Sequence, residues 1–201
     1  MSSITAVTLI PKPLLLLPAY ASLADPAAEL RAHCHAALAQ VAGAGPEQVT
    51  VIAEQASPGF RVAAAVLADS ALADLPVREL PVTEQTIDAV VAEVTAAAAG
   101  TALLVTGDGS ARRDPKAPGH FDPRAAAFDA EVCRALAAPD PAALAALDAG
   151  TARELLAAGW LGWQVLARVL PDTRTAYWWA DDPFGVQYAV ATWLPHPTPK
   201  P

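Results

Sequence analysis

Cysteine and histidine are scarce in this chain of 201 residues, which holds two cysteines and four histidines. Cys34 and Cys133 both fall in segments with a helical pattern, so we expect neither a disulfide framework nor a metal knuckle. Walker and dinucleotide-binding spacings are absent, as is a G-x-S-x-G elbow. These absences argue against a phosphate loop and a serine hydrolase, and the cysteine usage favours a cytoplasmic protein.

Basic residues are also in the minority, with 13 Lys and Arg against 21 Asp and Glu and a net charge of −8. Binding to nucleic acid depends on clustered positive charge that contacts phosphates, so nucleic acid is not expected as a main partner. A single basic cluster is present, formed by Arg112, Arg113, Lys116 and Arg124.

Long uninterrupted apolar runs are missing, because acids break them or they are too short to span a bilayer. We therefore expect no membrane residence. The first 21 residues lack a basic n-region, and Pro11, Lys12 and Pro13 interrupt their apolar stretch. This pattern predicts a strand and a loop rather than a signal peptide.

The residues that are present favour a folded domain, since 54% are hydrophobic and 17% are charged. Strand patterns are predicted at 4–10, 48–54, 59–67, 77–82, 101–107, 174–180 and 185–194, with 77–82 as a short edge segment. Helix patterns begin at the pairs Asp25-Pro26, Asp122-Pro123 and Asp140-Pro141. Thr83 predicts a further helix start, with Gly100 as its stop. A capping box at Thr151 and Glu154 predicts another helix, over 155–170.

This order predicts the α/β class: one layered domain over 1–195, with a central mixed β-sheet flanked by helices and a C-terminal β-hairpin. Residues 196–201 are expected to form a flexible, proline-rich tail. Ligands of such sheets bind outside the carboxyl ends of the strands. The candidate site walls are therefore the loops 11–24, 55–60 and 107–122, provided that their strands are parallel.

The loop 107–122 concentrates polar chemistry. Gly107 and Gly109 allow unusual backbone angles and the close approach of a ligand. Polar candidates for ligand binding are Asp108 and Ser110, while the side chains that could hold an anion are Arg112, Arg113 and Lys116. The structural alternative is a solvated surface loop whose Asp108 stabilises its own turn.

Other chemistry-bearing residues are more isolated. His33 and His35 stand two apart on a predicted helix and point about 200° away from each other, so they cannot share an ion. His120 lies in the candidate loop. Asp181 and Asp182 form a carboxylate pair in a predicted turn, where structural hydrogen bonding is the default.

Four stretches together resemble a known family: TLIPKPLLLLP (8–18), LLVTGDGSARR (103–113), KAPGHFDPRAAAFDAEVCRAL (116–136) and DDPFGVQYAVATW (181–193). In this order and spacing the chain resembles the class III extradiol ring-cleavage dioxygenases of the B-subunit type, with their Memo-like relatives, as a short divergent bacterial member. The resemblance implies a central sheet with helices outside and an Fe(II) held by two histidines and a carboxylate. That iron would bind a catechol-like diol and O₂.

The sequence departs from the family pattern at the reactive positions. Lys12 stands where the resemblance places the first histidine ligand, and a protonated lysine has no lone pair to donate. Glu54 or Gln55 stands in place of the second histidine, and Ala111 in place of the catalytic one.

We therefore expect an extradiol-like protein without a competent iron centre, and no cofactor. Its expected partner is a small anionic molecule or a protein, and homo-oligomerisation stays open. The ligand-binding candidates are Lys12, Glu54, Gly107, Asp108, Ser110, Arg112, Arg113 and Lys116. The alternative is an active Fe(II) dioxygenase with relocated ligands Glu54, His120, Asp181 and Asp182, and with His120 and Asp108 as catalytic candidates.

Overall fold

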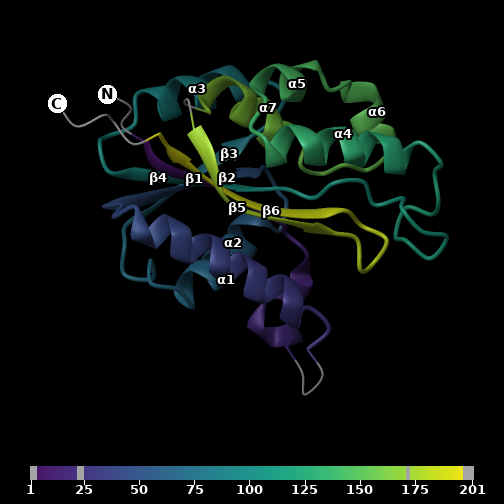
Figure 1. The fold of residues 1–201 in the computed structure, drawn as a ribbon, viewed down its shortest axis with the longest axis horizontal. Helices are drawn as coiled ribbons and strands as arrows, with labels where there is room; N and C mark the ends of the chain where they lie inside the picture. The colour runs from purple at the N-terminus through teal and green to yellow at the C-terminus, as the bar shows by residue number, and fades with distance from the viewer. Residues whose placement is uncertain (1–3, 22–24, 171–172, 197–201) are drawn as a thin grey trace.

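A six-stranded mixed sheet forms the centre of the molecule, with the strand order β3-β2-β4-β1-β6-β5 (Figure 1). The strands are β1 (Ile4–Ile10), β2 (Gln48–Glu54), β3 (Val77–Val82), β4 (Thr101–Thr106), β5 (Thr173–Asp181) and β6 (Tyr188–Pro195). The structure is a computed structural model that describes residues 4–21, 25–170 and 173–196. It confirms the predicted α/β class, the single domain and the C-terminal hairpin.

The four strands β1 to β4 are parallel, while β6 runs antiparallel to both β1 and β5. The register of the central pair runs from Ala6 opposite Ala102 to Ile10 opposite Thr106. Strands β1 and β4 therefore end level with each other. This level ending fixes the relative height of the loops that follow them.

Helices cover both faces of the sheet (Figure 1). The lower face in that view carries α1 (Ala28–Gly43) and α2 (Gly59–Ala68). The upper face carries α3 (Ile87–Thr95), α4 (Ala125–Ala137), α5 (Pro141–Ala146), α6 (Ala149–Glu154) and α7 (Trp160–Val169). The connections from β1 to β2 and from β2 to β3 run toward one edge of the sheet, and the connection from β3 to β4 runs back. Because crossovers between parallel strands are right-handed, this reversal places α3 on the opposite face from α1 and α2.

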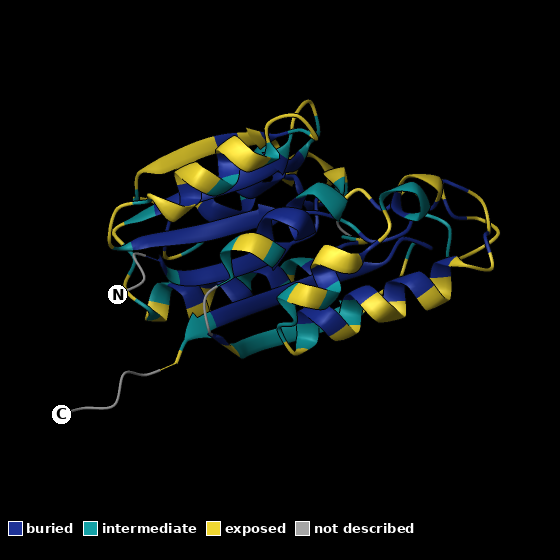
Figure 2. Ribbon diagram, turned by 90° about the horizontal axis from the view of Figure 1, so that it is seen from above, coloured by how far each residue is buried: buried dark blue, intermediate teal, exposed yellow. Residues whose placement is uncertain are grey.

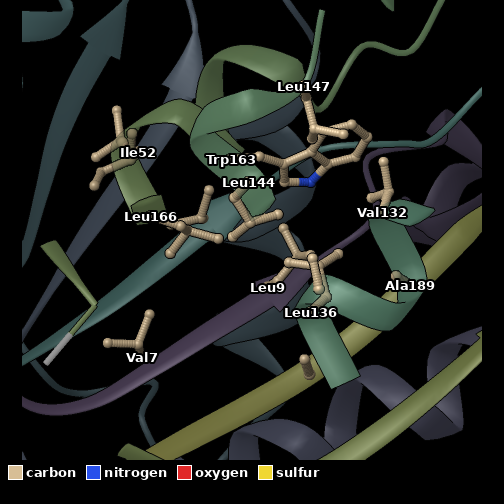
Figure 3. Close-up of a cluster of buried hydrophobic side chains, with 14 of the residues drawn as sticks. Val7, Leu9, Ile52, Val132, Leu136, Leu144, Leu147, Trp163, Leu166 and Ala189 are labelled. Carbon is tan, nitrogen blue, oxygen red and sulfur yellow. The ribbon is translucent and has the colours of Figure 1, made fainter. Parts of the chain in front are cut away.

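Two hydrophobic cores fill the spaces between the layers, because side chains of the central strands alternate between the faces. Val7 and Leu9 of β1 join the upper core with Trp163 and Leu166 of α7 (Figure 3). Ala6 and Ile10 of the same strand join the lower core against α1 and α2. The middle of the sheet is buried, and exposed residues lie mainly on the outer helix faces and loops (Figure 2).

One strand prediction was wrong: residues 59–67 form helix α2, not a strand. Its buried side chains are Val62, Ala63, Val66 and Leu67, which are related by steps of three (63 to 66) and four (62 to 66 and 63 to 67), as on one face of a helix. Ser57 Oγ accepts a hydrogen bond from the Gly59 N–H at 3.2 Å and so stabilises the first turn. The alternation required for a half-buried strand is absent from this segment.

Several helix boundaries also differ from the prediction: the helices expected from Asp25-Pro26 and Asp122-Pro123 begin only at Ala28 and Ala125. Thr83 and Thr86 cap a turn through reciprocal N–H to Oγ1 bonds, and α3 begins only at Ile87 and ends at Thr95. The exposed alanines that follow gain too little from packing to continue the helix.

The predicted capping box at Thr151 and Glu154 was likewise wrong. The cap is Asp148, whose Oδ1 accepts the Thr151 N–H at 2.7 Å, and α6 ends at Glu154. Leu156 then adopts a left-handed φ of 56°, and α7 starts only at Trp160.

In the described part of the chain, no helix has both the length and the apolar character required to span a bilayer. The predicted loop 11–24 contains two short 3-10 turns, at Leu14–Leu16 and Pro18–Tyr20. Its residues 22–24, and the predicted tail beyond residue 196, lie outside the described residues.

Candidate functional site

The carboxyl ends of the parallel strands meet at one edge of the sheet. This is the condition under which the loops after β1, β2 and β4 can form one site. After β1 the chain turns to the α1 face, whereas after β4 it turns to the face of α4 and α7. Neighbouring strands whose connections leave toward opposite faces define a topological switch point, the usual ligand position in open α/β sheets. The candidate site is therefore the edge beyond Ile10, Glu54 and Thr106.

Three predicted side chains converge at this switch point. The backbone N–H of Lys12 donates to Asp108 Oδ1 at 2.8 Å, which joins the loops after β1 and β4. Lys12 Nζ donates to Glu54 Oε2 at 3.2 Å, which adds the end of β2. The Lys12 side chain is 4% exposed and that of Glu54 is 43% exposed. The ion pair therefore joins a buried ammonium to a carboxylate that solvent reaches.

Burial sets the electrostatics of this cluster. Asp108 is partly exposed as a residue, but desolvation of its carboxyl raises the pKa to about 6, while the Lys12 N–H bond and the Lys12 charge act in the opposite direction. Asp108 therefore holds its proton to a higher pH than an exposed carboxyl does. A carboxyl of this kind can either accept or donate a proton at the edge of the site.

A hollow of about 300 Å³ opens beside Glu54. Its walls are Glu54, Glu84, Ala152, Arg153, Leu156, Ala157, Ala158, Trp160 and Leu161. Most of these belong to α6, to α7 or to the break between the two helices. An ion pair of 3.1 Å between Arg153 and Glu84 forms part of the wall, and the exposed Leu156 contributes an apolar surface.

The loop 107–122 is held in place by its own polar groups. The Ser110 N–H donates to Asp129 Oδ1 at 2.8 Å, and the Ser110 hydroxyl donates to the Leu155 carbonyl at 3.0 Å. Gln187 extends the contact on the other side, where its carbonyl accepts the Gly109 N–H and its N–H donates to the Ser110 carbonyl. Ser110 is completely buried, so it acts here as a structural residue.

Most of the predicted anion-binding side chains already face carboxylates. Arg113 Nε donates to Asp182 Oδ2 at 2.8 Å, and Arg112 lies 3.9 Å from Asp122. An external anion at these guanidiniums would have to displace a carboxylate of the protein. Lys116 is exposed and forms no ion pair with another described residue.

The same pattern holds at the end of the loop. Arg124 bridges Asp122 and Glu154 at 2.8 and 2.7 Å. Its hydrogen bonds lower the pKa of Asp122 to about 2.

The loop glycines serve protein packing, which corrects the prediction of ligand approach and unusual angles. Neither Gly107 nor Gly109 has a positive φ. A Cβ on Gly107 would lie 2.5 Å from the Gly159 Cα, and one on Gly109 would lie 2.7 Å from the Gln187 Cβ. The Gly159 N–H also donates to the Asp108 carbonyl at 2.7 Å. Gly159 thus lets the loop after β4 approach the start of α7 closely.

The alternative iron ligands are not gathered. His120 is exposed with a φ of 58°, Glu54 pairs with Lys12, and Asp182 pairs with Arg113. Among the described residues, no group of three or more His, Cys, Asp and Glu side chains is placed to hold a metal ion. At the switch point itself the donors are two carboxylates with an ammonium against one of them, a set that does not fit the two-histidine, one-carboxylate iron site that the resemblance implies.

Aromatic side chains of β5 pack on both faces of the sheet. Trp178 and Trp179 contact opposite cores, and both are half-buried. His33 stacks on Trp179 with ring centroids 4.4 Å apart, and its Nδ1 lies 2.5 Å from the Tyr177 hydroxyl oxygen. The histidine is thereby part of the packing around β5.

Sequence reasoning missed Asp129 and the walls of the hollow. Asp129 is completely buried on α4, and desolvation raises its pKa to about 6. A single acid between Phe128 and Ala130 in an alanine-rich helix was the available signal, since Phe128 and Val132 mark the buried face. The residues of the α6–α7 break gave no comparable signal.

Comparison of the chain with models of known protein families and with curated proteins gives no match.

Proposed function

We propose that this chain binds a small organic molecule at the carboxyl edge of its sheet, and that it does so without an iron centre. The proposal rests on two contacts of Glu54. Its carboxylate pairs with the buried Lys12, and the same residue lines the hollow next to Leu156 and Trp160. The resemblance to class III extradiol dioxygenases supplies the expected ligand class, a single ring with polar substituents such as a catechol-like diol.

The walls of the hollow suit such a molecule. Leu156, Trp160 and Leu161 offer apolar surface for a ring, and the half-exposed Glu54 carboxylate accepts hydrogen bonds from hydroxyl groups. Binding pockets for small molecules usually enclose about 300–1,000 Å³, and this hollow lies at the lower end of that range. A single-ring ligand matches that size better than a nucleotide does.

Lys12 is the reason for proposing a scaffold without iron. Its ammonium nitrogen bonds Glu54 at 3.2 Å and its backbone bonds Asp108, so the position that the resemblance assigns to a histidine ligand carries a cation. A cation repels Fe(II) and offers it no lone pair. Three expectations from the sequence remain proposals: an anionic ligand, a protein partner and a cytoplasmic location.

The test is calorimetric titration of the protein with catechol and with 3,4-dihydroxybenzoate, after the metal content of the same sample has been measured. We expect saturable binding that does not depend on iron. Glu54→Gln should weaken it by at least about tenfold, because a hydrogen bond to a charged acceptor contributes about 1.5–3 kcal/mol. Glu47→Gln is the matched control, since Glu47 is exposed just before the opposite end of the same strand.

Two results would reject the proposal. One is the absence of binding for both diols. The other is stoichiometric iron together with a ring-opened product, which would establish the alternative of an active dioxygenase.

A further inference from the structure

A second hollow, of about 390 Å³, lies between α4 and the β5–β6 hairpin. It is lined by Arg113, Ala126, Asp129, Ala130, Cys133, Ala180, Asp181, Asp182 and Gln187. None of these residues lines the hollow beside Glu54. Whatever binds here is therefore independent of the proposed function of the first hollow.

Asp129 gives this hollow a buried acceptor. Its side chain is 1% exposed, and its Oδ1 accepts the Ser110 N–H at 2.8 Å. Its Oδ2 is buried, and no hydrogen-bond donor of the described residues reaches it. The nearest cation is Arg113 Nε at 3.8 Å, beyond hydrogen-bond distance, and that nitrogen donates instead to Asp182 Oδ2 at 2.8 Å.

A buried carboxylate oxygen without a hydrogen-bond donor destabilises the folded state, and more so when the group is charged. The cost falls when a ligand supplies the missing N–H or O–H. Ser110 and Arg113 are both committed elsewhere, so the protein does not satisfy Oδ2 by itself.

The charge of the hollow selects a cation. Asp129, Asp181 and Asp182 contribute three carboxylates, against the single guanidinium of Arg113. Burial raises the pKa of the Cys133 thiol to about 11, so this residue adds no charge at neutral pH.

Room for a ligand comes from three alanines, Ala126, Ala130 and Ala180, whose methyl groups leave the space above Asp129 open. Gln187 is fixed at the edge of the hollow, where its amide donates to the carbonyls of Asp181 and Tyr188.

A small donor fits this arrangement better than a metal ion. Calcium takes about 6–8 oxygen ligands, and no group of three potential metal ligands is assembled among the described residues. An ammonium has three N–H donors and binds one charge-assisted acceptor strongly.

We propose that the hollow above Asp129 binds a small primary amine in its ammonium form, with Oδ2 of Asp129 as the buried acceptor and the carboxylates of Asp181 and Asp182 at the mouth. The ligand class is an alkylamine, with a short apolar chain against the alanines.

The probe is n-butylammonium chloride, titrated into the full chain at neutral pH and low salt and followed by calorimetry or by amide NMR shifts. We expect saturable binding, and no saturable binding of butan-1-ol, which has the same chain without the charge. Asp129→Asn should weaken butylammonium binding at least about tenfold. The variant loses the charge-assisted hydrogen bond, and the amide N–H of Asn then faces the N–H groups of the ammonium. Glu131→Gln, an exposed acid on the same helix, should bind as the unmodified protein does.

Ala130→Leu provides the second variant, since it fills the hollow and leaves Asp129 unchanged; it decides the matter if Asp129→Asn does not fold. Loss of binding in Ala130→Leu supports the proposal. The proposal is overturned if the unmodified chain does not bind butylammonium saturably, if butan-1-ol binds equally well, or if the folded variants bind like the unmodified chain. Failure here leaves diol binding at Glu54 untouched, because that titration uses another probe and another hollow.

Discussion

Substitution Gly107→Ala tests whether the contact between the loop after β4 and the start of α7 fixes the candidate site. The Gly107 N–H donates to the Ile10 carbonyl at 3.1 Å and so extends the pairing of β1 with β4. An added Cβ would lie 2.5 Å from the Gly159 Cα, which is backbone and cannot rotate away. Normal contacts between carbon atoms lie near 3.5–4.0 Å, so the two segments must separate by about 1 Å.

The magnitude follows from two losses. Overpacking of a filled interior costs about 1–3 kcal/mol. Separation also weakens the 2.7 Å bond from the Gly159 N–H to the Asp108 carbonyl, which is worth about 1 kcal/mol. We therefore expect a destabilisation of about 2–4 kcal/mol, a large share of the about 5–15 kcal/mol typical of a domain.

The assay is urea unfolding followed by tryptophan fluorescence, with the free energy of unfolding extrapolated to water. Gly43→Ala is the control, because Gly43 is the last residue of α1 and a Cβ there meets no atom within 4 Å. That change should be neutral or stabilise by about 0.5–1 kcal/mol. If Gly107→Ala unfolds at the same urea concentration as the unmodified chain, the packing argument for the site fails.

Three more predictions concern stability. Burial raises the pKa of Asp129 to about 6 from 3.8, so the folded state holds this proton more tightly, and the contribution of Asp129 to stability grows as the pH falls from about 6 to about 4. Asp129→Asn should remove that part of the pH dependence, and unfolding curves with identical pH slopes would contradict it. Asp148→Ala should cost about 1 kcal/mol by removing the cap of α6; a thermal unfolding midpoint equal to that of the unmodified chain would refute the cap. Gly162→Ala should cost about 1–3 kcal/mol in urea unfolding, because its Cβ would lie 2.7 Å from Val105 Cγ1; an unchanged midpoint would show that the core adapts.

The candidate site was predictable where a side chain directly follows a parallel strand. Lys12, Glu54 and Asp108 each stand within two residues of a strand end, and the parallel register brings those ends together. The basic residues farther into the loop could not be placed in this way. The partner of Arg113, Asp182, comes from a segment about seventy residues away, and spacing along the chain carries no information about that pairing.

The break between α6 and α7 shows the limit of local signals. Residues 155–170 carry a helical apolar pattern, yet the helix begins only at Trp160. The Gly159 N–H bonds the Asp108 carbonyl, and Leu156 takes a left-handed conformation, so a long-range contact outweighs the local preference.

By itself the sequence determined the layered class, because alternation and helical spacing decide which faces are apolar, and those faces must be buried against each other. It also determined that a lysine follows the first strand. The tertiary structure alone decided that Lys12 pairs with Glu54 and that Asp129 is buried beneath a second hollow. Both depend on which distant backbones come within a few ångströms of one another, and that proximity is set by the packing of the whole chain rather than by neighbours in sequence.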